Sequence, residues 1–410
     1  MDKTPWRMLF WLLVTQVMVA FVGRCIGPLA PFMEESFNLS KAQVGLLPAA
    51  LFVGQSIVSI LAGWYADVLG TRKMLLILSG VLCLGYLVAS LSPWYFLSLF
   101  FILIGGLGYG AMHPTSSRGI IYWFPSKVAG TAMGIKQMGV TGGSALAALL
   151  LIPLSLSIGW RLAIGSAVLL LALITGLSFL FYRDAPDEKE TAKVKPNFKE
   201  TLKQLLKHKP FLIISFAAMG LSGAQISVST YMVIFASQSL QYSLVIAGSF
   251  LALYEIGGSV GRIGWGVISD RIFSGKRVPV LIAIATITAI ISIILSALPE
   301  APSKWFLILI IFIMGFCVAG FNGIWMNFAA ESVEKRFSGL ASGLSLGIGS
   351  LGVVIGPPLF GAMVDWTGTF SMSWLFIFME MLVVIPFLWW AGRKEKESKN
   401  QPSYERVETL

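Results

Sequence analysis

Apolar runs recur along the whole chain and are separated by short polar segments. A bilayer core about 30 Å thick requires roughly 20 apolar residues in each spanning helix, so each run predicts one membrane-spanning helix. The pattern predicts twelve spans, at residues 6–30, 42–66, 73–92, 95–123, 128–153, 160–182, 210–236, 243–269, 279–298, 303–329, 337–362 and 370–391.

A long polar segment divides these spans into two sets of six. The predicted organisation is an N-terminal half at 1–182, a linker at 183–209, a C-terminal half at 210–392 and a polar tail at 393–410. Both polar segments are rich in lysine, which favours the same aqueous side for each of them.

The composition narrows the functions that are consistent with the sequence. Apolar residues make up 56% of it and charged residues only 12%, whereas a soluble domain has about 45–50% and about 25%. So little charge cannot cover a water-facing surface, which excludes a soluble enzyme. The three cysteines lie inside apolar runs without metal-ligand spacing. We therefore expect neither a metal nor a bound cofactor.

The net charge of +10 can be interpreted once the basic residues are assigned to loops. Of the 30 basic residues, 23 fall on the side of the linker and both termini, and three fall on the opposite side. This bias predicts that the linker and both termini are cytoplasmic, and it removes nucleic acid as an expected partner. The other four basic residues lie within spans: Arg24, Arg118, Lys136 and Arg262.

The two halves share sequence patterns, which indicates a duplicated unit. Residues 63–73 after the second span resemble residues 266–277 after the eighth, with Asp67 and Asp270 in register at an offset of 203. Residues 130–134 and 339–343 open the fifth and eleventh spans in the same way, at an offset of 209. A duplicated six-helix unit is typical of carriers whose site lies at the middle of the membrane.

At these residues the chain resembles the major facilitator superfamily. The loop pattern Gly-x3-Asp-x2-Gly-x-[Arg/Lys]2 is complete at Gly63, Asp67, Gly70, Arg72 and Lys73. The second copy keeps Gly266, Asp270 and a basic pair but has two extra residues before Gly275. The resemblance implies an all-α membrane protein with twelve helices in two pseudo-symmetric six-helix bundles, functional as a monomer in the lipid bilayer.

The resemblance also implies a gate on the cytoplasmic side, in which ion pairs hold the halves together. The candidate gating residues are Asp67, Arg72, Lys73, Arg118, Asp270, Arg271 and Glu331. In the alternative interpretation, the two aspartates only solvate helix ends.

Cations within the spans need an explanation, because each costs about 2.5–3.5 kcal/mol at the bilayer centre. The context of Arg262 resembles the eighth helix of oxalate/formate and monocarboxylate carriers, which implies binding of a substrate carboxylate. Its alternative role is a structural partner of Glu255, seven residues earlier. Arg24 resembles the first-helix arginine of organophosphate and anion:cation symporters, and is otherwise a structural arginine. With Lys136 as a third cation, the spans predict an anion site.

Other polar residues of the spans complete the predicted sites. Asn322 matches His113 at the 209 offset, so both are candidates to line the cavity. His113 and Glu255 are the alternative proton carriers, whereas we expect Glu380 to be structural. The full predicted substrate site consists of Arg24, Lys136, Arg262, Gln137, Gln225, Tyr231 and Asn322.

Taken together, these features predict a multi-pass carrier of a bacterial cytoplasmic membrane. It would take up a small organic anion, a mono- or dicarboxylate, with a proton by alternating access. The alternatives are a multidrug or metabolite exporter, disfavoured because the fifth span lacks a Gly-Pro motif, and a non-transporting receptor. A receptor would need a larger domain outside the membrane.

Overall fold

The computed structural model describes residues 4–184, 198–299, 302–331 and 338–400, and these residues contain helices and turns but no strand. Twelve helical segments are long and apolar enough to cross a membrane, as the hydropathy pattern predicts. The first half contains α1 Thr4–Gly23, α2 Ile26–Phe37, α3 Lys41–Leu69, α4 Thr71–Leu91, α5 Tyr95–Trp123, α6 Ser126–Ile158 and α7 Trp160–Phe181.

The second half repeats this arrangement after a short helix, α8 Phe198–Lys207. Its elements are α9 Lys209–Ile234, η2 Phe235–Ser239, α10 Leu244–Arg271, α11 Arg277–Ser296, α12 Lys304–Met314, η3 Gly315–Ala319, α13 Asn322–Glu331, α14 Ser338–Thr367 and α15 Ser371–Asn400. The two η segments are π-helical.

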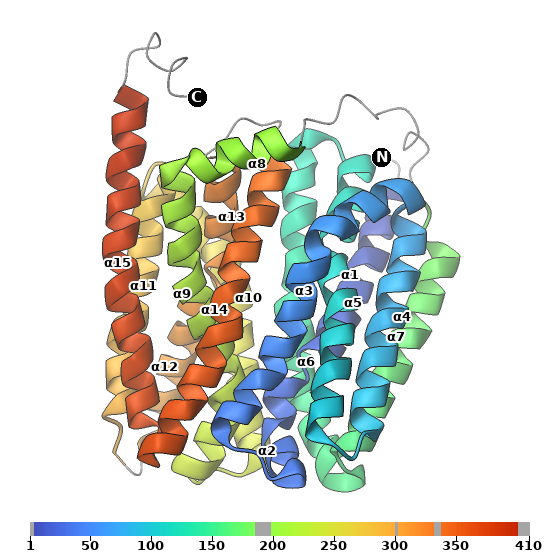
Figure 1. Cartoon of the computed structure of the whole chain (residues 1–410), viewed down its shortest axis with the longest axis vertical. Coiled ribbons are helices and arrows are strands. Elements are labelled where there is room, and N and C mark those ends of the chain that lie inside the picture. Colours follow the sequence, from blue (N-terminus) through green and yellow to red (C-terminus); the bar gives the residue numbers. More distant parts are fainter. Residues whose placement is uncertain (1–3, 185–197, 300–301, 332–337, 401–410) are drawn as a thin grey trace.

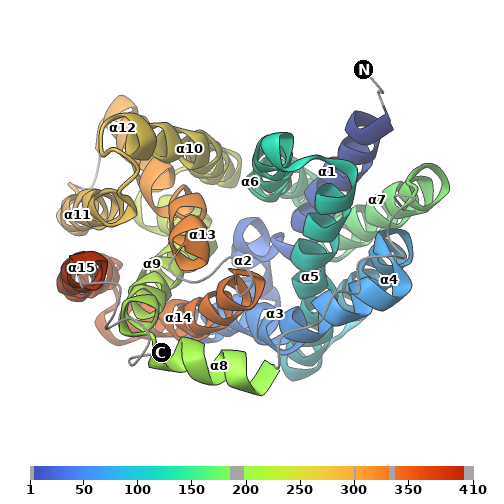
Figure 2. The same ribbon diagram turned by 90° about the horizontal axis from the view of Figure 1, so that it is seen from above.

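The helices form two bundles that stand side by side (Figure 1). Seen from above, α1 and α3–α7 lie in one bundle and α9–α15 in the other (Figure 2). Helix α8, the start of α1 and the end of α15 lie at one end of the molecule, which we call the linker end. Helix α2 lies at the other end, which we call the opposite end.

The outer surface of the bundles is apolar, as a lipid-facing surface must be. Large side chains such as Leu91, Leu169 and Leu180 are 65–70% exposed. In water such a surface would be an aggregation site, so the exposed leucines agree with the membrane location that the composition predicts.

The halves contact each other mainly through two pairs of helices, α3 with α14 and α6 with α10. Glycines permit the approach: an added side chain at Gly45 of α3 would overlap the backbone of Pro357 in α14, and one at Gly248 of α10 would overlap Ile152 in α6. Small residues at such crossings let membrane helices pack closely. These contacts lie between the middle of the spans and the opposite end.

Several elements differ from the sequence prediction. The first span breaks at Arg24 and Cys25 into α1 and α2, and the tenth span is interrupted by η3. The linker contains α8, because Leu202 and Leu205 fall on one face of an otherwise charged segment, and Leu205 is buried beside Phe211 and Ala329. Helix α15 continues past residue 391 to Asn400.

Candidate functional site

A polar cavity of about 130 Å³ lies between the halves. It is lined from both bundles, by α1, α3, α5 and α6 of the first half and by α9, α10, α13 and α14 of the second. Its polar lining residues are Gln16, Arg24, Gln55, Tyr109, His113, Gln137, Ser222, Gln225, Arg262, Asn322 and Ser350. So many polar groups inside apolar helices indicate a site for a polar ligand.

Arg24 lies at the break between α1 and α2, where the chain leaves the helix. The carboxyl end of α1 favours a cation there through the helix dipole. The Arg24 Nε donates to the Tyr109 hydroxyl at 3.2 Å, and Nη1 donates to Glu255 Oε1 at 3.5 Å. Arg24 therefore joins the two halves, since Glu255 belongs to α10.

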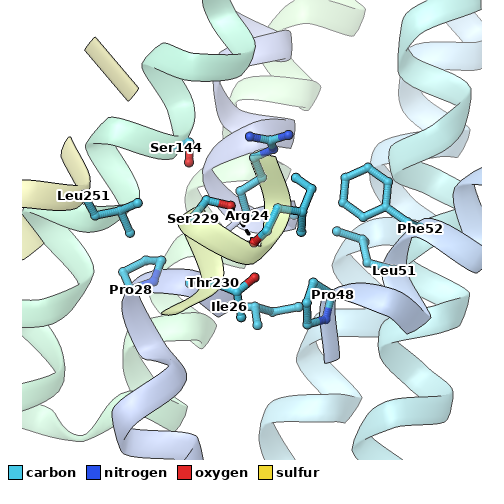
Figure 3. Close-up of a pocket in the computed structure, with 13 residues that line it drawn as sticks. Arg24, Ile26, Pro28, Pro48, Leu51, Phe52, Ser144, Ser229, Thr230 and Leu251 are labelled. Atoms are coloured by element: carbon cyan, nitrogen blue, oxygen red, sulfur yellow. Dashed lines mark hydrogen bonds between the residues drawn. The ribbon is translucent and has the colours of Figure 1, made fainter. Parts of the chain in front are cut away.

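Arg24 also borders a second, smaller pocket of about 20 Å³. Figure 3 shows its guanidinium at one side of this pocket, with Leu51 from α3 and Ser229 and Thr230 from α9 around the space. The arginine thus lies between the central cavity and the helices that close the opposite end.

Glu255 is fully buried and does not line the central cavity. Its Oε1 accepts hydrogen bonds from Arg24 and, at 2.9 Å, from the Ser144 hydroxyl of α6. Its Oε2 has no hydrogen-bond partner. A buried carboxylate oxygen without a partner is costly, so Glu255 depends on Arg24 for its charge.

Arg262 reaches across from the second half to the first. Its Nη1 donates to the backbone oxygen of Gln137 in α6 at 2.8 Å, and its Nε donates to Ala319 at 3.3 Å. Ala319 ends the π-helical segment η3, and single π-helical turns within helices occur frequently at functional sites. Because Glu255 binds Arg24, the alternative of an Arg262–Glu255 pair is not the arrangement seen here.

His113 and Lys136 belong to one chain of hydrogen bonds. His113 contacts Ser117 Oγ at 3.1 Å and Gln137 Nε2 at 3.1 Å, and Lys136 donates to the same Ser117 at 3.3 Å. His113 and Gln137 line the cavity, whereas Lys136 is fully buried behind them. The predicted third cation therefore does not itself line the cavity, because His113 and Gln137 lie between them.

The remaining predicted substrate residues separate into two groups. Gln225 and Asn322 line the cavity and are bonded to each other, with Asn322 Nδ2 donating to Gln225 Oε1 at 3.2 Å. The buried Gln225 Nε2 has no partner among the described residues, which leaves its N–H groups for a ligand. Tyr231 lies outside the cavity, and its hydroxyl bonds to the backbone oxygens of Lys41 and Pro357.

The predicted gating residues whose side chains the structure describes lie at the ends of α4, α5 and α10 that are nearest the linker end. Asp270 pairs with Arg277 at 2.7 Å within the second half, and Arg271 and Lys73 are exposed. Arg72 donates to the Phe179 carbonyl at 2.6 Å, and Arg118 is buried with its guanidinium over the Tyr122 ring. The side chains of Asp67 and Glu331 lie outside the described part of the structure.

Sequence reasoning missed several residues of the cavity. Gln16, Gln55 and Tyr109 line it from the first half, and Ser222 and Ser350 line it from the second. Glutamines within apolar runs are a usable signal, because an uncharged amide in a spanning helix also needs a partner. The serines and the tyrosine give no such signal, since they occur throughout spans as packing residues.

Comparison with known proteins agrees with this arrangement. The family model for the major facilitator superfamily matches residues 12–344 and 275–409. A probable sulfoacetate transporter of Cupriavidus necator is 22% identical over 398 residues, covering 90% of each chain. The hexose-6-phosphate:phosphate antiporter of Escherichia coli is 25% identical over 380 residues, covering 83% of this chain and 80% of the antiporter.

The fold is also that of solved transporters. A bacterial homologue of the human lysosomal transporter Spinster, in an inward-facing and occupied conformation, superposes with a TM-score of 0.79 at 17% identity. The match covers 96% of this chain and 98% of the homologue. With a family match that spans nearly its whole length, the chain belongs to the major facilitator superfamily of membrane transporters.

Proposed function

We propose that this protein carries a small organic anion across the membrane together with a proton, by alternating access. The observation that supports the proposal most is that Arg24 and Arg262, one from each half, line the same cavity between the halves. Two guanidinium groups in a low-dielectric site attract an anion strongly. The related sulfoacetate and hexose-6-phosphate carriers named above also act on anions, which favours the same substrate class here.

A carboxylate suits this pair of arginines. The planar guanidinium can donate two parallel hydrogen bonds to a carboxylate. The free Gln225 amide and the neighbouring Asn322 can bind a second polar group of the substrate. A substrate held by both halves would draw them together, which is what an occluded carrier requires. The proposed substrates are therefore small mono- or dicarboxylates.

The Arg24–Glu255 pair suggests how a proton is coupled to the anion. A substrate carboxylate that binds Arg24 would compete with Glu255 for the same guanidinium. Glu255 would then be an ionised group buried with only Ser144 as a partner, which is strongly unfavourable. Taking up a proton removes this cost. Anion binding and protonation of Glu255 therefore favour each other, as symport requires.

His113 is less suited to this task. His113 and Lys136 both bond to the Ser117 hydroxyl. Gln137, whose side chain contacts the His113 ring, accepts a hydrogen bond from Arg262 through its backbone oxygen. A proton on His113 would add a positive charge beside two cations, and like charges in a buried site repel each other. We therefore assign the coupling proton to Glu255 and a polar lining role to His113.

The charge bias supports an orientation of the protein in the membrane. The linker end bears most of the basic residues, so we propose that it faces the cytoplasm. The hydrogen bonds between the halves that we describe lie from the middle of the spans to the opposite end, which we propose is closed toward the outside in this conformation. A substrate released from it would enter the cell.

Uptake into proteoliposomes tests the proposal. Labelled acetate, lactate, oxalate, succinate and sulfoacetate would be offered with and without an inward proton gradient. We expect at least one to accumulate only with the gradient. Arg262→Ala should reduce its uptake by about tenfold or more, because a charge-assisted hydrogen bond contributes about 1.5–3 kcal/mol. Unchanged uptake by Arg262→Ala would remove this arginine from the site.

A further inference from the structure

The start of α3 is capped by a residue from the other half of the molecule. The backbone N–H groups of Lys41 and Ala42 donate to the two carboxylate oxygens of Asp365, each at 2.8 Å. Asp365 lies near the end of α14, which belongs to the second half. The first N–H groups of a helix have no partner within it, and the helix dipole favours an anion there. A carboxylate of α14 thus caps the N-terminus of α3.

The same helix start has a second cap, which belongs to its own half. Ser40 Oγ accepts from the N–H of Gln43 at 3.3 Å, and the Gln43 side chain accepts from the N–H of Ser40 at 2.9 Å. This capping box moves with α3 and does not depend on the position of α14. The start of α3 therefore has one cap from its own half and one from the other half. Removing each cap separately distinguishes the stability of α3 from the contact between the halves.

Further contacts around Asp365 join the halves at this end. The Tyr231 hydroxyl of α9 bonds to the backbone oxygens of Lys41, at 2.5 Å, and Pro357, at 3.0 Å. The Lys41 ammonium donates to Gln238 of η2. The contacts made by Lys41 and Ala42 lie at the first turn of α3, whereas the bond from Tyr231 to Pro357 lies within the second half. The halves therefore cannot separate at the opposite end while the start of α3 remains bonded to the second half.

We propose that Asp365 is a lock that holds the opposite end closed and is released whenever the halves separate there. The inference rests on alternating access, but not on the identity of the substrate or of the proton carrier. In the separated conformation the two N–H groups would bond to water, so the cap stabilises only the closed conformation. Asp365 is exposed, and water therefore replaces part of the interaction when it breaks.

Distance measurements between spin labels test the lock directly. Labels at Trp94→Cys, which precedes α5, and Trp305→Cys, in α12, would report the separation of the halves at the opposite end, since both side chains are exposed there. The three natural cysteines would be replaced by alanine. We expect Asp365→Ala to raise the ratio of long to short distances by about fivefold in nanodiscs without substrate.

Two further variants make the result specific. Ser40→Ala removes the internal cap of the same helix and should leave the ratio unchanged, because it weakens α3 in both conformations. Asp365→Asn keeps an acceptor but loses the charge, so it should give an intermediate shift even if the alanine variant does not fold. Equal shifts from Ser40→Ala and Asp365→Ala, or no shift from either Asp365 variant, would overturn the lock. Because no substrate is present, that failure would leave the proposed transport function standing.

Discussion

Arg24 gains its role from residues far away in the sequence. Charges inside apolar runs are visible in a sequence because they are costly in a membrane, so Arg24, Arg262 and Glu255 could be selected as candidate site residues. Their partners could not be predicted. Arg24 and Glu255 are 231 residues apart, and the seven-residue spacing of Glu255 and Arg262 suggested a different pair. The break after α1 turns Arg24 toward α10 instead.

Tyr109 is the residue that orients Arg24. Its hydroxyl accepts from the Arg24 Nε, and its ring packs against Gly23, where no side chain could fit. Tyr109→Phe should raise the KM for the transported anion by about tenfold, because a hydrogen bond to a charged group contributes about 1.5–3 kcal/mol. We expect a smaller effect on kcat.

The matched control is Tyr86→Phe. The Tyr86 hydroxyl donates to the Gly23 carbonyl at 2.8 Å, in the same region but without a contact to the guanidinium. Initial uptake rates over a range of concentrations give both constants. An equal rise in KM for the two variants would mean that Tyr109 only supports packing around Gly23.

The elements divide into those that hydropathy predicts and those that it cannot. Ten of the twelve predicted spans correspond to uninterrupted helices or to an α-helix extended by a π-helical turn. The breaks at Arg24 and at η3 have no signature in an averaged apolar pattern. Yet both place cavity residues, since Arg24 lies at one break and Asn322 follows the other. Irregular backbone within a membrane is tolerated where it lines a cavity.

The cap at the start of α9 predicts that the stability of the protein depends on pH. His208 caps this helix, with its Nδ1 accepting from the N–H of Phe211 at 3.3 Å. Burial lowers the pKa of His208 below its ordinary value of 6.5, because the charged ring loses water. The unfolded chain therefore binds the proton more readily than the folded protein does. The cap contributes about 1 kcal/mol to the free energy of unfolding. This contribution is present above pH 6.5 and is lost as the pH falls through the pKa of His208 in the folded protein.

Thermal unfolding of the purified protein between pH 8 and pH 5 measures this contribution. His208→Asn keeps a capping acceptor but cannot titrate in this range. The variant should therefore lose less stability than the wild type on acidification. The same pH dependence in both proteins would show that His208 does not contribute to it.

At the scale of the whole molecule, the duplicated halves place one arginine each around a shared cavity. The number of spans and the internal repeat follow from the sequence, since each half must cross the same bilayer. The contacts between the halves do not follow, because they depend on which conformation the carrier adopts. The Asp365 cap is an example. A single acidic residue near the end of a span does not indicate a partner in the sequence, and its contact with the start of α3 is visible only in the structure.

We propose that an anion displaces Glu255 from Arg24 and that Glu255 then takes up a proton. Calorimetric binding of the transported carboxylate at pH 7, repeated in buffers of different ionisation enthalpy, counts the protons taken up with it. The wild type should bind the anion with uptake of about one proton, and Glu255→Gln should bind it with none. Binding without proton uptake by the wild type, or the same uptake by both proteins, would exclude this coupling of the anion to Glu255.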